Sequence, residues 1–153
     1  MNILKIIVLI SIGFVLLNCD NAKPVSNHSS AESSTSSLPN NDLLTSQNLE
    51  INAVKNELPI EIDELTTLFD VFADNNIINY KYRVKNTPKQ ALLLTSTLDT
   101  LRSNLLNDYC QNVPQMKELK NVFPNGANYH YFINDEEIVI VELNPDDCQS
   151  EKS

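Results

Sequence analysis

Few side chains of this chain have the chemistry for acid–base catalysis, and they lie far apart in the sequence. His130 stands between two tyrosines, and the acids Glu61, Asp63 and Glu64 follow Pro59. Carboxyl groups can share acid–base work when their surroundings separate their pKa values, and a histidine can act as a base beside a nucleophile. The chain has no nucleophile motif and no glycine-rich phosphate loop. We therefore interpret the acids as a solvated loop or a helix start.

No residue pattern predicts a metal or cofactor site. His28 lies among serines and asparagines without further ligands, and zinc sites need several. The acids at 135–137 and at 146–147 lack the oxygen-ligand spacing of a calcium loop, so they are predicted to be solvated turns. We expect no metal and no cofactor.

The three cysteines are Cys19, Cys110 and Cys148, an odd number that requires an explanation in an exported protein. Cys19 ends an apolar run over residues 6–17, which follows Lys5. As a helix this run would be about 18 Å long, short of the roughly 30 Å hydrocarbon core. Its length and position are typical of a signal peptide. The alternative is an N-terminal membrane helix in which Cys19 is incidental.

The stretch Leu16-Leu17-Asn18-Cys19 resembles the lipobox of bacterial lipoprotein precursors. The resemblance implies that the Cys19 thiol receives a diacylglycerol, that residues 1–18 are removed, and that the new amino end is acylated. Asn18 departs from the Gly, Ala or Ser that the family prefers before the cysteine. Two or three acyl chains hold a protein at a bilayer stably, whereas one holds it marginally. We expect an exported envelope lipoprotein that faces the periplasm, in the inner or the outer membrane.

Residues 19–42 are predicted to be a disordered tether after the lipidated cysteine. They are rich in Ser and Asn and have almost no apolar side chains, so they cannot bury enough surface to offset the entropy of ordering. The folded domain is predicted over residues 43–148, with a disordered tail at 149–153.

Hydrophobic periodicity predicts a helix, a hairpin, two further helices and a second hairpin in the domain. The first helix is expected over residues 46–58 and the first hairpin over 66–84, with its turn at 74–76. A helix should begin with Thr87 as N-cap and Pro88 in the first turn, and continue to residue 107. A short helix at 114–122 and a hairpin turning at 134–135 complete the pattern.

These elements predict an α+β fold with a small, mostly antiparallel four-stranded sheet and helices on one face. The strand at 138–143 is apolar on both faces and is expected to be central. Residues 79–84 (NYKYRV) and 128–133 (NYHYFI) repeat a Tyr-x-Tyr pattern, which we interpret as a coincidence of strand patterning. Their four tyrosines would be core residues under the helices, or a binding surface if they lay on the open face.

Because Cys19 is assigned to the lipid, Cys110 and Cys148 remain as a pair. Export permits a disulfide between them, which would join a helix end to a sheet end. A metal site or a catalytic thiol is the rival interpretation, but neither has the histidine and acid partners that it would need.

Spaced residues in the domain resemble a group of small exported bacterial proteins of unknown function. The matching positions in this chain are Leu58-Pro59, Asp63, Thr66, two Tyr-x-Tyr strands, Tyr109-Cys110 and Asp147-Cys148. The resemblance covers roughly residues 50–148. It implies a secreted, disulfide-closed domain and transfers no activity.

A net charge of −9 over 153 residues argues against a nucleic-acid partner, which needs a basic face. An anchor, a tether and a stapled domain without a catalytic constellation predict a non-enzymatic protein-binding module, such as an assembly factor, an inhibitor or an immunity-type protein, with an envelope protein as partner. The alternatives are a small envelope hydrolase that uses His130 and the acids at 61–64, and a structural lipoprotein without a specific partner.

Overall fold

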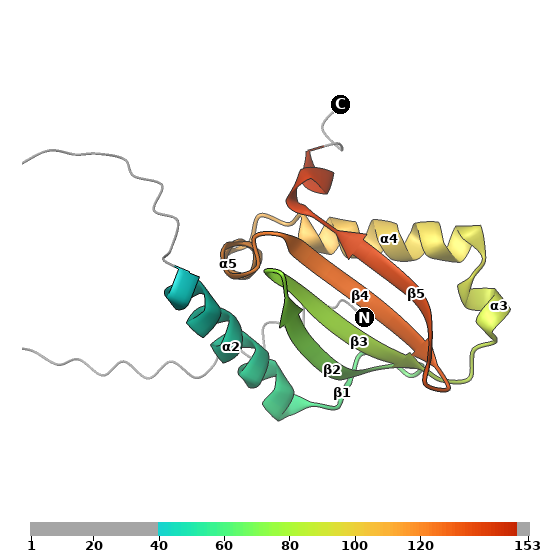
Figure 1. The fold of residues 1–153 in the computed structure, drawn as a ribbon. Helices are drawn as coiled ribbons and strands as arrows, with labels where there is room; N and C mark the ends of the chain where they lie inside the picture. Colours follow the sequence, from blue (N-terminus) through green and yellow to red (C-terminus); the bar gives the residue numbers. More distant parts are fainter. Residues whose placement is uncertain (1–39, 150–153) are drawn as a thin grey trace, which may run out of the picture.

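The computed structural model of the chain describes residues 40–149 (Figure 1). The predicted signal peptide, Cys19 and most of the predicted tether lie outside these residues. Within residues 40–149, no helix combines the length and the apolar character needed to cross a membrane.

The fold is α+β, as predicted, but its sheet has five strands and is mixed. The strands are β1 (Ile60–Glu61), β2 (Thr66–Asp74), β3 (Ile77–Val84), β4 (Gly126–Ile133) and β5 (Glu136–Leu143), and they lie side by side in that order. The pairs β1–β2, β2–β3 and β4–β5 are antiparallel, whereas β3–β4 is parallel. The predicted four-stranded sheet therefore missed the two-residue strand β1 and the parallel pair.

In the described range 40–149, four α-helices and a short 3₁₀ helix accompany the sheet. They are α2 (Asn40–Glu57), α3 (Lys89–Leu92), α4 (Thr95–Tyr109), α5 (Pro114–Val122) and η1 (Pro145–Cys148). Helix α5 has the predicted bounds, because a proline starts it and another proline follows it. Helix α2 begins at Asn40 rather than at residue 46, so it includes residues that the sequence assigned to the tether.

The single helix predicted from Thr87 to residue 107 is wrong, because the chain breaks between α3 and α4. Leu94 is extended, with φ −62° and ψ 133°, and its side chain is 56% exposed. Thr87 does not cap a helix, since its hydroxyl donates to the carbonyl oxygen of Lys85 at 3.2 Å. The break lets Leu92 and Leu105 both be buried from separate helices, so tertiary packing overrides the continuous helical pattern.

Both predicted hairpin turns are present. Asn75 and Asn76 have φ of 51° and 61°, and Asn134 and Asp135 have φ of 50° and 65°. Two consecutive residues with positive φ match the right-handed twist of the strands that they join, and Asn and Asp tolerate this conformation best after glycine. Local turn chemistry therefore fixes both hairpins.

Strand β5 is an edge strand, so the prediction of a central position was wrong. One side of β5 is core, with Val141 and Leu143 buried, but Ile140 on its other side is 44% exposed. The apolar run that suggested a central strand thus includes a side chain that no described element covers.

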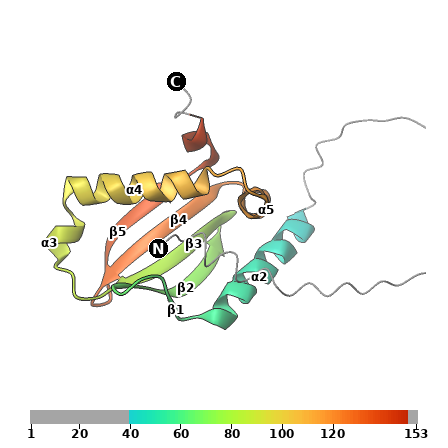
Figure 2. The ribbon, with the colours of Figure 1, turned by 180° about the vertical axis from the view of Figure 1, so that it is seen from behind.

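The helices α2, α4 and α5 pack on one side of the sheet. Strand β5 passes in front of α4 in Figure 1 and behind it when the molecule is seen from the other side in Figure 2. Buried residues of the sheet, of α2, of α4 and at the end of α5 join in one core, which includes Ile51, Val54, Val71, Ile78, Leu105, Tyr109, Phe123 and Leu143. Helix α2 borders β2 and α4 borders β5, so the central strands β3 and β4 lie between them.

Candidate functional site

The four tyrosines of the two Tyr-x-Tyr strands form the most distinctive surface of the domain. Strands β3 and β4 pair in parallel so that Tyr80 lies beside Tyr129, and Tyr82 lies beside Tyr131. The repeated segments 79–84 and 128–133 therefore pair residue by residue. In-register parallel pairing thus places like residues of the two segments next to each other.

The tyrosine rings stack across the two strands. The ring centroids of Tyr80 and Tyr129 are 5.4 Å apart, and those of Tyr82 and Tyr131 are 5.2 Å apart, with near-parallel planes in both pairs. Tyr82 and Tyr129 also stack diagonally, at 6.4 Å. We call these four residues the tyrosine row.

The tyrosine row lies on the helix side of the sheet, next to the core, as the sequence predicted. Tyr131 is 7% exposed, but Tyr80, Tyr82 and Tyr129 are only partly buried. Burial raises the pKa of all four phenols, so they stay neutral over the physiological pH range. The row thus combines a core role with partial exposure of three of its four members.

An open pocket of about 470 Å³ continues the row at its Tyr131 end. Val84, Leu92 and Leu101 contribute apolar side chains to its lining. The remaining lining residues are mostly polar and come from the start of β2 and the loop before it, from the connection between β3 and α3, and from α4: Asp63, Glu64, Leu65, Thr66, Thr87 and Thr97. The pocket therefore has an apolar floor and acidic groups at one side.

Carboxylates approach the tyrosine row from three elements. Asp63 acts electrostatically on Tyr131, Asp108 of α4 acts on Tyr129, and Glu50 of α2 acts on Tyr80. Glu118 of α5 in turn acts on Glu50. We call these four carboxylates the acidic rim: Glu50, Asp63, Asp108 and Glu118.

Two carboxyl groups of the acidic rim have raised pKa values. Burial, and secondly the negative charge of Glu118, raises the pKa of Glu50 above its usual value. Burial alone raises the pKa of Asp108. A cation nearby would favour the charged form of each carboxyl.

The structure places His130 on the opposite face of the sheet from the tyrosine row. Its Nδ1 lies 2.8 Å from Oε2 of Glu137, and its Nε2 lies 3.1 Å from Oδ1 of Asn79. Asn128 donates to the same Asn79 oxygen at 3.2 Å. Both ring nitrogens of His130 thus have oxygen partners, and within the described residues no nucleophile lies at hydrogen-bond distance of the ring.

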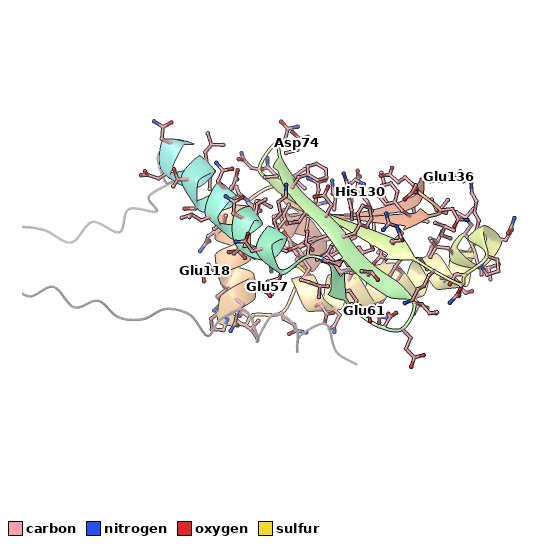
Figure 3. All side chains as sticks on the ribbon, turned by 90° about the horizontal axis from the view of Figure 1, so that it is seen from below. Glu57, Glu61, Asp74, Glu118, His130 and Glu136 are labelled. Atoms are coloured by element: carbon pink, nitrogen blue, oxygen red, sulfur yellow. A yellow bond between two sulfur atoms is a disulfide. The ribbon has the colours of Figure 1, made fainter. Side chains whose placement is uncertain are left out.

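The acids at 61–64 do not meet His130. Glu61 lies on β1, and β2 and β3 separate it from β4, as the green strands between the two labelled side chains show (Figure 3). Three inter-strand spacings amount to about 14 Å. Asp63 instead accepts hydrogen bonds from the backbone N–H groups of Leu65 and Thr66, both at 2.8 Å. The structure therefore does not assemble the catalytic set of the hydrolase alternative.

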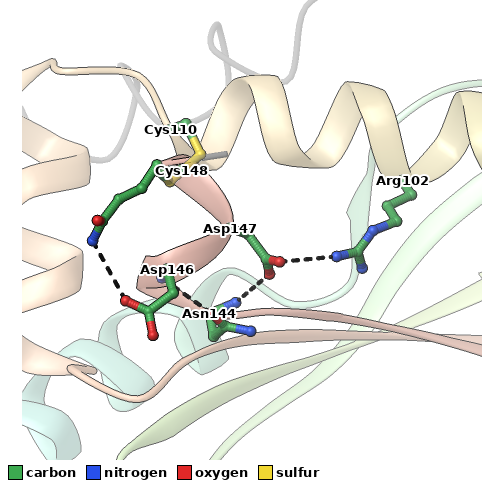
Figure 4. Close-up of a disulfide and its surroundings, with 7 residues drawn as sticks. Arg102, Cys110, Asn144, Asp146, Asp147 and Cys148 are labelled. Atoms are coloured by element: carbon green, nitrogen blue, oxygen red, sulfur yellow. Dashed lines mark hydrogen bonds and ion pairs between the residues drawn. A yellow bond between two sulfur atoms is a disulfide. The ribbon is translucent and has the colours of Figure 1, made fainter. Parts of the chain in front are cut away.

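Cys110 and Cys148 are joined by a disulfide; they are 38 positions apart in the sequence, and their Cα atoms are 5.3 Å apart (Figure 4). The bond connects the end of α4 to η1. Around it, Arg102 forms an ion pair with Asp147 at 3.2 Å, and the Asp147 carboxylate accepts from the backbone N–H of Asn144 at 2.9 Å. Asp63, Thr66 and Asp147, which carried the resemblance to exported proteins, thus have structural roles.

No group of three or more His, Cys, Asp or Glu side chains that could hold a metal ion occurs between residues 40 and 149. His28 and Cys19 lie outside the described residues.

No protein-family model matches the chain. Protein K of Escherichia coli is 29% identical over 98 residues, which are 64% of this chain and 52% of that protein, so the match spans about half of the relative's length. A candidate secreted protein of Pseudomonas aeruginosa has a similar structure, with a TM-score of 0.60 and 16% identity over 74% of this chain and 98% of its own. The chain therefore shares the fold of that protein.

A pilotin of the type 2 secretion system of Vibrio vulnificus is more distant in structure. Its TM-score is 0.49 and its identity is 19%, over 71% of this chain and 94% of its own.

Proposed function

We propose that the chain is a lipid-anchored protein-binding module of the bacterial envelope, and that the tyrosine row is its binding surface. The observation that carries this proposal is a stacked, partly exposed aromatic row with carboxylates on several sides. Tyrosine is enriched in protein interfaces because it offers a large contact area at a low cost in side-chain entropy.

The chemistry of the site defines the partner. The rings and the apolar floor of the pocket favour apolar side chains, whereas the acidic rim favours Lys or Arg. We therefore expect an amphipathic segment of another envelope protein, with an apolar side that covers the row and basic residues beside the rim. Glu50 and Asp63 approach opposite ends of the row, so basic residues should flank the apolar part on both sides.

The anchor places this module outside the cytosol. In this proposal Cys19 carries the lipid after residues 1–18 are removed, and residues 19–39 form the tether to a domain that begins with α2 and extends to residue 148. A flexible chain of this length spans roughly 25 Å on average. A disulfide is expected to persist in an oxidising compartment, so the bond between Cys110 and Cys148 supports export.

Site-specific photo-crosslinking in native membranes tests the binding surface. A benzoylphenylalanine at position 50 should crosslink to one discrete protein, because Glu50 borders the tyrosine row. The matched control is position 49, since Leu49 lies on the same helix and is 67% exposed. The crosslink at position 50 should disappear when Glu118→Lys reverses the charge of the rim.

Equal crosslinking from positions 49 and 50, or a crosslink that survives Glu118→Lys, would contradict the proposed surface. Repeated failure to obtain any crosslink would favour a structural lipoprotein without a specific partner.

Intact-mass measurement of the membrane-purified protein under non-reducing conditions tests the anchor. We expect loss of residues 1–18, acyl chains on Cys19, and two thiols fewer than in the reduced protein. An unacylated full-length precursor would contradict the anchor without bearing on the tyrosine row.

A further inference from the structure

Strand β5 has a long outer edge without a partner strand in the described part of the chain. The opposite edge is formed by the two-residue strand β1 and by the remainder of β2, which α2 borders. Strand β5 has eight residues, with glutamates near its ends and the apolar run Ile138-Val139-Ile140-Val141 at its centre. Proteins usually protect a long edge with Lys, Pro or a bulge, because its unpaired N–H and C=O groups can bind another strand. A register shift between Tyr131 and Phe132 of β4 leaves Ile138 as a bulge in β5, but the five residues that follow it pair regularly and contain neither Lys nor Pro.

The direction of the free backbone groups follows from one contact. Nη1 of Arg102 donates to the carbonyl oxygen of Glu142 at 2.8 Å, so this carbonyl points away from β4. Backbone groups alternate in direction along an antiparallel strand. The N–H and C=O groups of Ile140 therefore point to the same outer side as the carbonyl of Glu142. Arg102 occupies only one end of this edge.

The helix layer provides a wall beside the free edge. An open pocket of about 640 Å³ lies between β5 and the α3–α4 region. Leu93, Leu98 and Asp99 contribute to its helix side, and Leu93 is 45% exposed. The break between α3 and α4 places Leu93 in this wall. We call this pocket, together with the outer edge of β5 beside it, the slot. It combines an unpaired strand edge with apolar side chains.

The charges of the slot are mainly acidic. Asp99 and Glu142 both line it, and neither carboxylate forms an ion pair within residues 40–149. Arg102 is the basic lining residue, but its guanidinium is engaged with Asp147 and with the Glu142 carbonyl. A second copy of this chain, with its net charge of −9, would be repelled here, whereas a segment with Lys or Arg would be attracted.

We propose that β5 binds an extended segment of a partner protein as a sixth strand of the sheet. The segment hydrogen-bonds to the backbone of Ile140, and its alternate side chains pack on Leu93 and Leu98. A Lys or Arg of the segment lies near Asp99. This site is separate from the tyrosine row and does not rest on the function proposed for it.

Selection from a phage-displayed library of random peptides about ten residues long, the upper end of ordinary strand length, tests this site on the full chain in detergent. We expect enriched peptides in which apolar and polar residues alternate and which include a basic residue. The variant Ile140→Pro removes the outward N–H and fills the edge with a ring, which an edge strand tolerates. It should weaken the enriched peptides at least tenfold. The matched variant Ile140→Ala keeps the N–H and should weaken them less.

Two further variants make the test independent of the folding of Ile140→Pro. Asp99→Lys and Leu93→Lys change only exposed positions at the helix wall and should also weaken the peptides, Asp99→Lys most for the basic ones. Glu50→Lys, beside the tyrosine row, should leave them unchanged.

Three outcomes would overturn the proposal. They are enrichment of no peptide, binding that is insensitive to the variants at positions 93, 99 and 140, and crosslinking of two copies of the chain through position 93. Sensitivity to Glu50→Lys alone would assign the peptides to the tyrosine row instead.

Discussion

Removing the disulfide should lower the stability of the domain by an amount that the loop length sets. The bond closes a loop of 38 residues. In the chain-entropy model, such a loop corresponds to about 4 kcal/mol of stabilisation through restriction of the unfolded chain. Domains of this size are stable by about 5–15 kcal/mol, so the loss is a large part of the total. The perturbation is the double substitution Cys110→Ser and Cys148→Ser.

The native contacts around the bond should keep the folded structure of this variant intact. Arg102 still pairs with Asp147, and Asn144 still caps η1 through Asp146 and Asp147. These contacts hold η1 beside the end of α4 without the sulfur atoms. The effect should therefore be visible in the free energy of unfolding rather than in the circular dichroism of the folded state.

Urea unfolding of residues 20–153, exported through a conventional cleavable signal peptide, measures the effect. The unfolding midpoint of the double-serine variant should fall, and dithiothreitol should bring the parent close to the variant. Dithiothreitol should not change the variant, which is the control for other effects of the reductant. A loss below about 1 kcal/mol would refute the assignment of the stabilisation to loop closure.

Three further predictions concern single residues. Tyr109→Phe should stabilise by about 1 kcal/mol in urea unfolding, since its hydroxyl is buried without a hydrogen-bond partner within the described residues. Gly126→Ala should prevent folding, measured as loss of soluble export, because φ is +123° and the new Cβ would lie 2.1 Å from the carbonyl oxygen of Leu143. Burial raises the pKa of Glu50 above its usual 4.5, so the stability of the parent falls as the pH rises from 4.5 through the raised pKa. Glu50→Gln should therefore stabilise at pH 7 and not below pH 4.5 in urea unfolding.

Much of the local structure could be predicted from the sequence, because it depends on neighbouring residues. Asn75-Asn76 and Asn134-Asp135 fixed both hairpin turns, and the prolines at 114 and 124 fixed the ends of α5. The break at Leu94 could not be predicted in this way. Its cause is the burial of Leu92 and Leu105 from two separate helices, which a local pattern does not show.

The candidate site was predictable in its residues but not in its arrangement. The sequence singled out the tyrosines and placed them on one face, yet it could not pair β3 with β4, since strand pairing depends on the path of the intervening chain. The repeat of NYKYRV and NYHYFI was the available signal. In-register pairing also explains the Asn79–Asn128 hydrogen bond on the other face. Residues that repeat in the sequence thus contact each other across the two strands.

One feature of the topology produces both proposed binding surfaces. Two parallel neighbours cannot be joined by a tight turn, so the chain between β3 and β4 must cross the sheet. In this domain α3, α4 and α5 form that connection and lie on the tyrosine side. The same crossover therefore supplies helices to both surfaces. Helices α4 and α5 lie beside the tyrosine row, and α3 and α4 lie beside the free edge of β5. Because the two surfaces use different sides of α4, a partner on one leaves the other accessible, and a single envelope protein could occupy both.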